Sequence, residues 1–333
     1  MKKLEKSKLI LSLLFLLATN VFAQQFIYKP ASLTEEAIPF QKIEGDHLER
    51  FTKPFEIQRL SKNVYWVSAS YYNVSVVVGE KGVLLIDAPI MRGKRILQAM
   101  QEITDKPVTA LVYSHAHKDH IGDAAAILEE VKNKIEIYST KEVADEIISH
   151  NMMMPPPTKI ISSKGFDFEG IKINVGENLD GHTIDNTSFI INDGGRQILH
   201  AVDLVHPDQL EFKNFSLSQD VIKFEADLKT LIDLKWDVMV TGHGNLAYKE
   251  DIQFIQSYIA DIKSFLGKGF SEIKFEDSIK PGTPYAWFEG YKDGVVGVAL
   301  KLLADKYRSG REKEFDTVAK SHIETLFWAM FVR

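Results

Sequence analysis

The sequence predicts a protein of the α/β class, built from layers of helices and sheets. Short β-branched or aromatic runs alternate with single segments of helical periodicity, and this alternation occurs in two successive halves of the chain. The 333 residues are enough for a substantial core, and 45% hydrophobic with 26% charged residues is ordinary globular composition. The composition therefore excludes wholesale disorder and a collagen-like or fibrous structure.

The first half of the chain, from about Phe55, alternates the two periods that distinguish strands from helices. Runs of Val, Ile and aromatic residues end at Gly, Asn or Pro, which is typical of strands. Ile96, Met100 and Ile103 instead recur at the spacing of one helical face. The predicted strands cover 63–68, 73–79, 83–87, 108–114 and 135–138, and the predicted helices cover 92–103, 123–131 and 141–150.

The second half repeats this mixture and then becomes helical. From about Gly269, apolar residues such as Val295, Val298 and Leu302 recur at helical spacing, which indicates helices packed on the preceding domain. The predicted strands cover 171–175, 188–192, 197–201 and 237–241, and the predicted helices cover 220–234 and 251–266.

The amino terminus has the order of a cleavable export signal. Four lysines precede an apolar run over residues 9–18, and Val21 and Ala23 stand at the −3 and −1 positions of a cleavage site. The run is shorter than the ~20 residues that span a bilayer, so we expect cleavage, a periplasmic or secreted protein and no stable membrane anchor. The expected organisation is a signal peptide over 1–23, an N-terminal extension over 24–54, the main domain over 55–268 and a helical C-terminal extension over 269–333.

Charge and cysteine content narrow the chemistry. The chain has no cysteine, which excludes disulfides, a thiol nucleophile and a metal site with Cys ligands. Any metal must therefore be bound by His, Asp or Glu. The net charge is −6 and becomes more negative once the basic leader is removed. An acidic exported protein is a poor candidate for binding a phosphate backbone, so we expect a small-molecule substrate and no nucleic acid.

The predicted strand 108–114 leads directly into a cluster of metal-ligand side chains. His115, His117, Asp119 and His120 fall within six residues, although the whole chain has only ten histidines. A loop at a strand end can turn alternate side chains inward, so His115 and His117 can bind one ion while Asp119 and His120 reach a second. Imidazole and carboxylate ligands suit Zn²⁺, and also Fe²⁺ or Mn²⁺.

This motif, SHAHKDH over residues 114–120, resembles the HxHxDH signature of the metallo-β-lactamase superfamily of metal-dependent hydrolases. The resemblance covers about residues 55–266 and implies a four-layer αββα sandwich. It also implies two metal ions, since the family's later ligand positions follow in order. The implied ligands are His115, His117 and His182 for the first ion, Asp119, His120 and His243 for the second, and Asp203 as the bridge, with Asp87 bracing the site.

The function implied by this resemblance is direct hydrolysis. A metal-bridging hydroxide would attack a small ester, thioester, lactone or lactam, and Asp119 would be the catalytic residue that orients it. The expected cofactors are two divalent ions, with zinc first and iron or manganese as alternatives.

Several members of the superfamily remain as alternatives. The family's β-lactamases usually lack an aspartate at the position of Asp203, which lowers that possibility without removing it. Flavodiiron oxidoreductases carry Glu where this chain has His117, and the family's nucleases act on polyanions. The resemblance leaves open a single-iron persulfide dioxygenase, a β-lactamase proper, or a metal-binding module without catalysis.

Other residues are candidates for the pocket wall. Tyr71 and Tyr72 lie at a hairpin tip, His206 follows Asp203, and the MMMPPP segment (152–157) can form a lid, although each also has an ordinary structural explanation. Four further histidines are expected to be structural or surface residues, namely His47, His150, His200 and His322.

Overall fold

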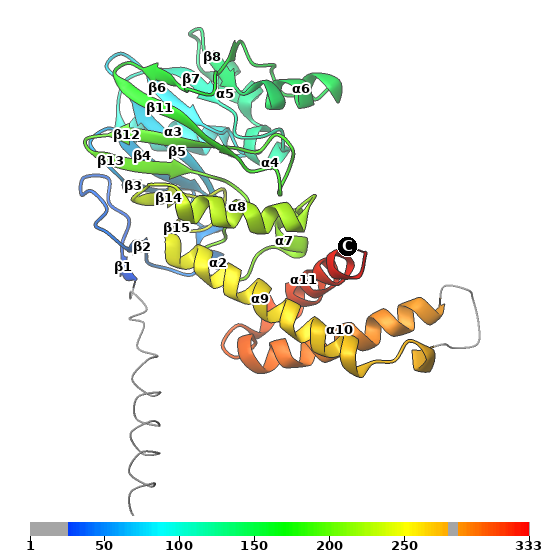
Figure 1. The fold of residues 1–333 in the computed structure, drawn as a ribbon. Coiled ribbons are helices and arrows are strands. Elements are labelled where there is room, and N and C mark those ends of the chain that lie inside the picture. The colour runs from blue at the N-terminus through cyan, green and yellow to red at the C-terminus, as the bar shows by residue number, and fades with distance from the viewer. Residues whose placement is uncertain (1–25, 279–285, 333) are drawn as a thin grey trace, which may run out of the picture.

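Two β-sheets pack face to face in the computed structural model of the chain, which describes residues 26–278 and 286–332 (Figure 1). The first sheet has seven strands in sequence order, antiparallel up to β6 and parallel from β6 onward. Its strands are β3 Glu56–Arg59, β4 Val64–Ala69, β5 Tyr72–Val78, β6 Val83–Ile86, β7 Val108–Val112, β8 Glu136–Ser139 and β9 Lys159–Ile160.

The second sheet has six strands, also in sequence order. All neighbours are antiparallel except the parallel pair β13–β14. A short parallel pair, β1 (Ile27–Lys29) with β2 (Gln41–Ile43), lies beside it near β15. The six strands are β10 Phe166–Phe168, β11 Ile171–Asn178, β12 Thr187–Asp193, β13 Arg196–His200, β14 Val238–Val240 and β15 Leu246–Ala247.

Three hydrophobic clusters define the layers. Trp66 and Phe189 belong to the cluster between the sheets, to which both sheets contribute. A second cluster packs helices against the first sheet, for example through Ile96, and a third packs helices against the second sheet, for example through Phe224. The order is helices, sheet, sheet, helices, so the predicted α/β class and four-layer αββα sandwich are confirmed.

The helices cover the outer faces of the sandwich and continue past it. The helical C-terminal region begins within α9, which passes residue 268 without a break. The helices are α2 His47–Arg50, α3 Gly93–Ile103, α4 Lys118–Ile121, α5 Ala124–Glu130, α6 Lys141–Ser149, α7 Lys213–Leu217, α8 Val221–Asp233, α9 Lys249–Glu272, α10 Ala286–Tyr307 and α11 Glu312–Val332, with a 3₁₀ turn over Glu276–Ser278.

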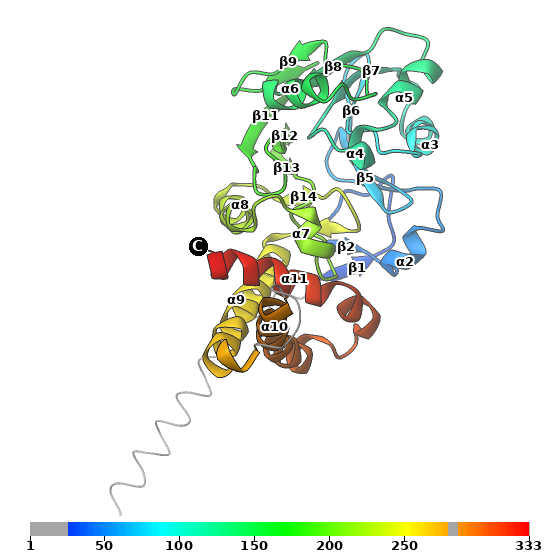
Figure 2. The same cartoon turned by 90° about the vertical axis from the view of Figure 1, so that its right-hand side faces the viewer.

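The pair α10 and α11, here called the C-terminal arm, packs on α9, and α11 also runs along α7 (Figure 2). His322 of α11 joins these elements, since its Nε2 lies 2.9 Å from the carbonyl oxygen of Phe212 and its Nδ1 lies 3.2 Å from the hydroxyl of Tyr258. The arm is thereby fixed to the segment that leads into α7.

The structure differs from the sequence prediction mainly at short elements. The motif that begins at His115 does not run as a loop to Gly122, because Lys118–Ile121 forms the single helical turn α4. Residues 26–54 carry two short strands and α2, where only an extension was expected. The predicted signal peptide lies outside the described residues. Among the helices of the described ranges, none has the length and apolar character needed to cross a membrane.

Candidate metal centre

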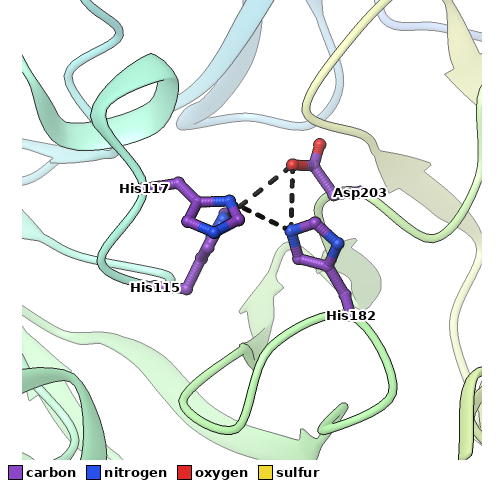
Figure 3. Close-up of side chains that lie close together, drawn as sticks. All are labelled: His115, His117, His182 and Asp203. Carbon is purple, nitrogen blue, oxygen red and sulfur yellow. Dashed lines mark hydrogen bonds and ion pairs between the residues drawn. The ribbon is translucent and has the colours of Figure 1, made fainter. Parts of the chain in front are cut away.

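The seven predicted ligand side chains converge at one edge of the sandwich, on loops that follow strands. Figure 3 shows four of them pointing toward one another. In each of two groups, the candidate ligand atoms lie within 4.8 Å of one another, and Asp203 belongs to both groups. The first group is His115, His117, His182 and Asp203, and the second is Asp119, His120, Asp203 and His243.

The first group has the spacing of donors around a common centre. Nε2 of His182 lies 3.2 Å from Nδ1 of His117 and 3.3 Å from Oδ2 of Asp203. Nε2 of His115 lies 3.8 Å from the same Asp203 oxygen. The strand β7 and the turn after it position His115 and His117, while His182 comes from the loop after β11.

The second group shares that carboxylate. Nε2 of His120 lies 3.0 Å from Oδ2 of Asp203, and Nε2 of His243 lies 3.3 Å from Oδ1. Asp119 lies 3.4 Å from His120 and 3.5 Å from His243, and its side chain is 41% exposed, so it faces the opening of the site. The turn α4 places Asp119 and His120 side by side.

A buried hydrogen-bond network holds the first loop in place. Asp87, at the end of β6, accepts hydrogen bonds from the backbone N–H and the hydroxyl of Ser114, each at 2.9 Å. It also lies 3.2 Å from Nε2 of His200, whose Nδ1 contacts Ser75 at 2.9 Å. The expected bracing by Asp87 and the structural place of His200 agree with this network, which fixes the direction of the loop that carries His115.

Gly242 is required because of close approach at the site. A Cβ at this position would lie 2.5 Å from Cε1 of His120 and 2.8 Å from Oδ1 of Asp203. The same loop also joins the two sheets, since the backbone N–H of Asn73 donates to the Gly242 carbonyl at 2.9 Å and that of Gly244 donates to Tyr71 at 3.0 Å. The hairpin tip of β4 and β5 is thereby attached to the loop that carries His243.

The donor set fits a divalent cation. Nε2 of His115 and Oδ1 of Asp203 are buried and form no hydrogen bond with any residue that the structure describes. Burial and the neighbouring imidazoles hold the pKa of His115 well below its usual value, which keeps the ring neutral as a metal ligand must be. Burial alone would raise the pKa of Asp203, but the adjacent imidazoles, His120 above all, hold it well below its usual range.

The residues that the sequence offered as candidates for the pocket wall lie in two different hollows. Tyr71 and Tyr72 contact the ring of His243, with centroids 5.6 and 4.8 Å away, and both line the cavity at the metal centre. His206 stacks on His243 at 5.4 Å and also lines the cavity. Met152 and Met153 instead line a separate hollow of 440 Å³ beside His117.

The cavity at the metal centre has a volume of 1010 Å³ and extends well beyond the predicted ligands. Its outer wall comes from α2, from residues 208–217 and from the start of α11. His47, expected to be a structural or surface residue, lies in this wall with its side chain 34% exposed. No motif marks these wall residues, which is why sequence analysis missed them.

Two facing sheets with helices outside, and His and Asp side chains gathered at one edge, indicate a metal-dependent enzyme of the metallo-β-lactamase fold. The metallo-beta-lactamase superfamily model matches residues 68–243, and the chain belongs to this superfamily. The predicted family and the prediction of a hydrolase are therefore confirmed. Members of this family typically bind divalent metals, and many of its enzymes act on small molecules.

Known proteins resemble the chain over limited stretches. A linear primary-alkylsulfatase from Pseudomonas sp. (strain ATCC 19151) is 26% identical over 96 residues, which is 27% of this chain and 18% of that protein. An (R)-specific secondary-alkylsulfatase from Pseudomonas sp. is 31% identical over 88 residues, 24% of this chain and 13% of that protein. The matches thus span less than a fifth of either relative's length.

Solved structures resemble the fold. A metallo-β-lactamase from Pontibacter korlensis has a TM-score of 0.52 at 20% sequence identity, and the likeness covers 61% of this chain and 97% of that one. At this identity the likeness shows the common fold alone.

Proposed function

We propose that this chain is an exported hydrolase that uses two divalent ions, with zinc as the expected metal, to cleave a small ester, thioester, lactone or lactam. The single observation that supports two ions is the position of Asp203, which belongs to both groups of ligand atoms. His115, His117 and His182 would hold the first ion. Asp119, His120 and His243 would hold the second.

When bound, two divalent ions lower the pKa of a water molecule toward neutrality, so that hydroxide is available. The residues around that site would orient the attacking water and the metal ligands. Burial raises the pKa of Asp119, but hydrogen bonding to His120 and His243 outweighs it and keeps this pKa below its usual range. Asp119 therefore stays ionised and orients the attacking water by accepting its hydrogen bond. Asp87 and Ser114 keep His115 in position.

Sulfate esters form a second candidate substrate group. The two relatives named above are both alkylsulfatases. This chain, which is similar to them over short stretches, belongs to the metallo-beta-lactamase superfamily. The metallo-β-lactamase from Pontibacter korlensis is similar in fold alone, so it does not favour the β-lactamase alternative over sulfate esters.

Metal content and turnover together test the hydrolase proposal. Elemental analysis of protein purified without added metal should give about two divalent ions per chain. A panel of nitrocefin, homoserine lactones, thioesters, p-nitrophenyl esters and alkyl sulfates should include at least one substrate, and His117→Ala should abolish its turnover. His150→Ala changes an exposed histidine that belongs to neither ligand group, and it serves as the matched control. One iron per chain, with oxygen uptake and no hydrolysis, would contradict the proposal.

Export requires its own test, because it is supported by the N-terminal pattern alone. Mass spectrometry of the protein from periplasmic and medium fractions should find a mature chain that begins at Gln24. Detection of only the full-length chain in the cytoplasm would contradict export.

A further inference from the structure

The outer half of the metal cavity is lined by large apolar side chains that remain exposed. Leu48 is 62% exposed, Phe51 47%, Phe212 52% and Leu217 56%, and all four line the same cavity as the predicted metal ligands. We call these four residues the apolar rim. Exposed apolar groups that gather around one opening mark a binding site, because scattered single residues would not converge in this way.

The rim is assembled from separate parts of the chain. Leu48 and Phe51 belong to α2 and its end, in the N-terminal segment, while Phe212 precedes α7 and Leu217 is its last residue. In Figure 2, α2 and α7 both lie on the side of the molecule where α11 begins. The cavity wall includes the start of α11, with Thr317 and Val318, and charged residues of both signs. Much of this wall therefore lies outside the stretch matched by the superfamily, residues 68–243.

The backbone at α7 is held in an unfavourable conformation that leaves Leu217 exposed. Residues 214–217 have φ between 52° and 58°, the left-handed region that L residues with side chains rarely adopt. The arm supports this turn, because His322 contacts the Phe212 carbonyl oxygen at 2.9 Å and the backbone N–H of Asn214 donates to Ser321 Oγ at 3.1 Å. Strained segments of this kind cluster at ligand sites.

Two carboxylates of the cavity wall already have partners. Asp208 accepts hydrogen bonds from Tyr28 and Asn245 and pairs with the buried Lys42, while Glu211 contacts Nδ1 of His206 at 2.6 Å. The rim itself thus offers a ligand mainly apolar contact. The cavity volume of 1010 Å³ is also at the upper end of the range for small-molecule sites, roughly 300–1,000 Å³, and exceeds what a small reacting group requires.

We infer that the apolar rim binds an alkyl or acyl chain of the substrate while the reacting group lies at the metal centre. This inference rests on the proposed hydrolase function and specifies its substrate as an ester with a chain. The chain can belong to the acyl side or to the alcohol side of the ester, because both present the same methylene groups to the rim.

Two series of substrates test this inference. One is p-nitrophenyl esters from acetate to decanoate, and the other is alkyl sulfates from butyl to dodecyl. In the series that is hydrolysed, kcat/KM should rise roughly threefold for each added methylene, as expected for burial of apolar surface, until the cavity is full. The double variant Leu48→Asp with Phe212→Asp should reduce this slope by half or more. Ile148→Asp changes an apolar side chain that is 68% exposed outside the cavity, and it should leave the slope unchanged.

Binding of a fluorescent long-chain fatty acid to metal-depleted protein separates the rim from catalysis. Wild-type protein should bind the probe, and the double variant should bind it at least tenfold more weakly. If no substrate of either series is hydrolysed but this difference in binding is observed, the proposed ester hydrolysis fails while the chain site stands.

Three results would overturn the chain site. The first is a kcat/KM that does not depend on chain length, and the second is equal binding of the probe by wild type and double variant. The third is a wild-type dimer that becomes a monomer in the double variant without loss of probe binding, because the rim would then be a dimer interface.

Discussion

The inner and outer halves of the cavity differ in almost every physical respect. The inner half consists of buried imidazoles and carboxylates whose directions are set by hydrogen bonds, such as those from Ser114 to Asp87. The outer half consists of exposed apolar side chains on short elements, such as Leu48 on α2. The difference suggests that chemistry demands fixed ligand directions, whereas chain binding demands only apolar area in the right place.

The largest effect should follow from removal of the carboxylate that both ligand groups share. Asp203→Ala leaves the imidazoles of His120, His182 and His243 without their common anionic neighbour. We expect a loss of kcat/KM on the order of 10³-fold, because a metal site supplies several kcal/mol of transition-state stabilisation. Activity assays with elemental analysis check this. If Asp203→Ala kept the metal content and turnover of the wild type, the inner half would not depend on this shared carboxylate.

The junction between the arm and the cavity wall should be sensitive to pH. Burial lowers the pKa of His322 to about 4, against the partly opposing hydrogen bond to the Phe212 carbonyl. Below pH 6.5 the unfolded chain therefore binds a proton that the folded protein does not, so stability falls as the pH drops from 6.5 toward 4. The loss should reach about 3 kcal/mol near pH 4, and about 2 kcal/mol of it should be present at pH 5.

Urea unfolding of wild type and His322→Gln between pH 7.5 and 5 checks this prediction. The variant should lack the part of the pH dependence that His322 supplies. Parallel curves for the two proteins would show that the arm is not held through a neutral histidine.

An intermediate effect is expected from the network beneath the inner half. Asp87→Asn keeps the size of the side chain but removes the charge beside Ser114 and His200. Loss of such a supporting partner typically costs 10–100-fold in metal affinity or activity. Competition with a chelator should therefore remove metal from Asp87→Asn at a lower chelator concentration. An unchanged chelator midpoint would mean that the loop is rigid without this carboxylate.

The smallest effect should occur at the boundary between the two halves. Tyr71→Phe keeps the ring that stacks on Phe51 at 4.6 Å and contacts His243, and it removes only the hydroxyl that accepts a hydrogen bond from Gln209. One neutral hydrogen bond contributes about 1 kcal/mol, so KM should change less than about fivefold. Michaelis–Menten kinetics with the best panel substrate measures this change. A loss as large as that of Asp203→Ala would place Tyr71 in the chemistry itself.

Much of the fold was predictable because its longer elements have clear periods. The all-buried β6 and the amphipathic α3 lie within a residue of their predicted ranges. The missed elements are short. The turn α4 is formed within a motif chosen for metal ligands, and α7 has a left-handed backbone that no propensity of Phe, Ser and Leu would indicate.

The sequence by itself determined the fold class, the family and the candidate ligand set. Metal ligation requires a few residue types, and the order in which this family carries them is visible along the chain. Only the tertiary structure decided that His200 joins Asp87 beneath the first loop, and that Leu48, Phe51, Phe212 and Leu217 surround one opening. The physical reason is that apolar contact depends on which distant surfaces meet in space, and it leaves no local pattern in the chain.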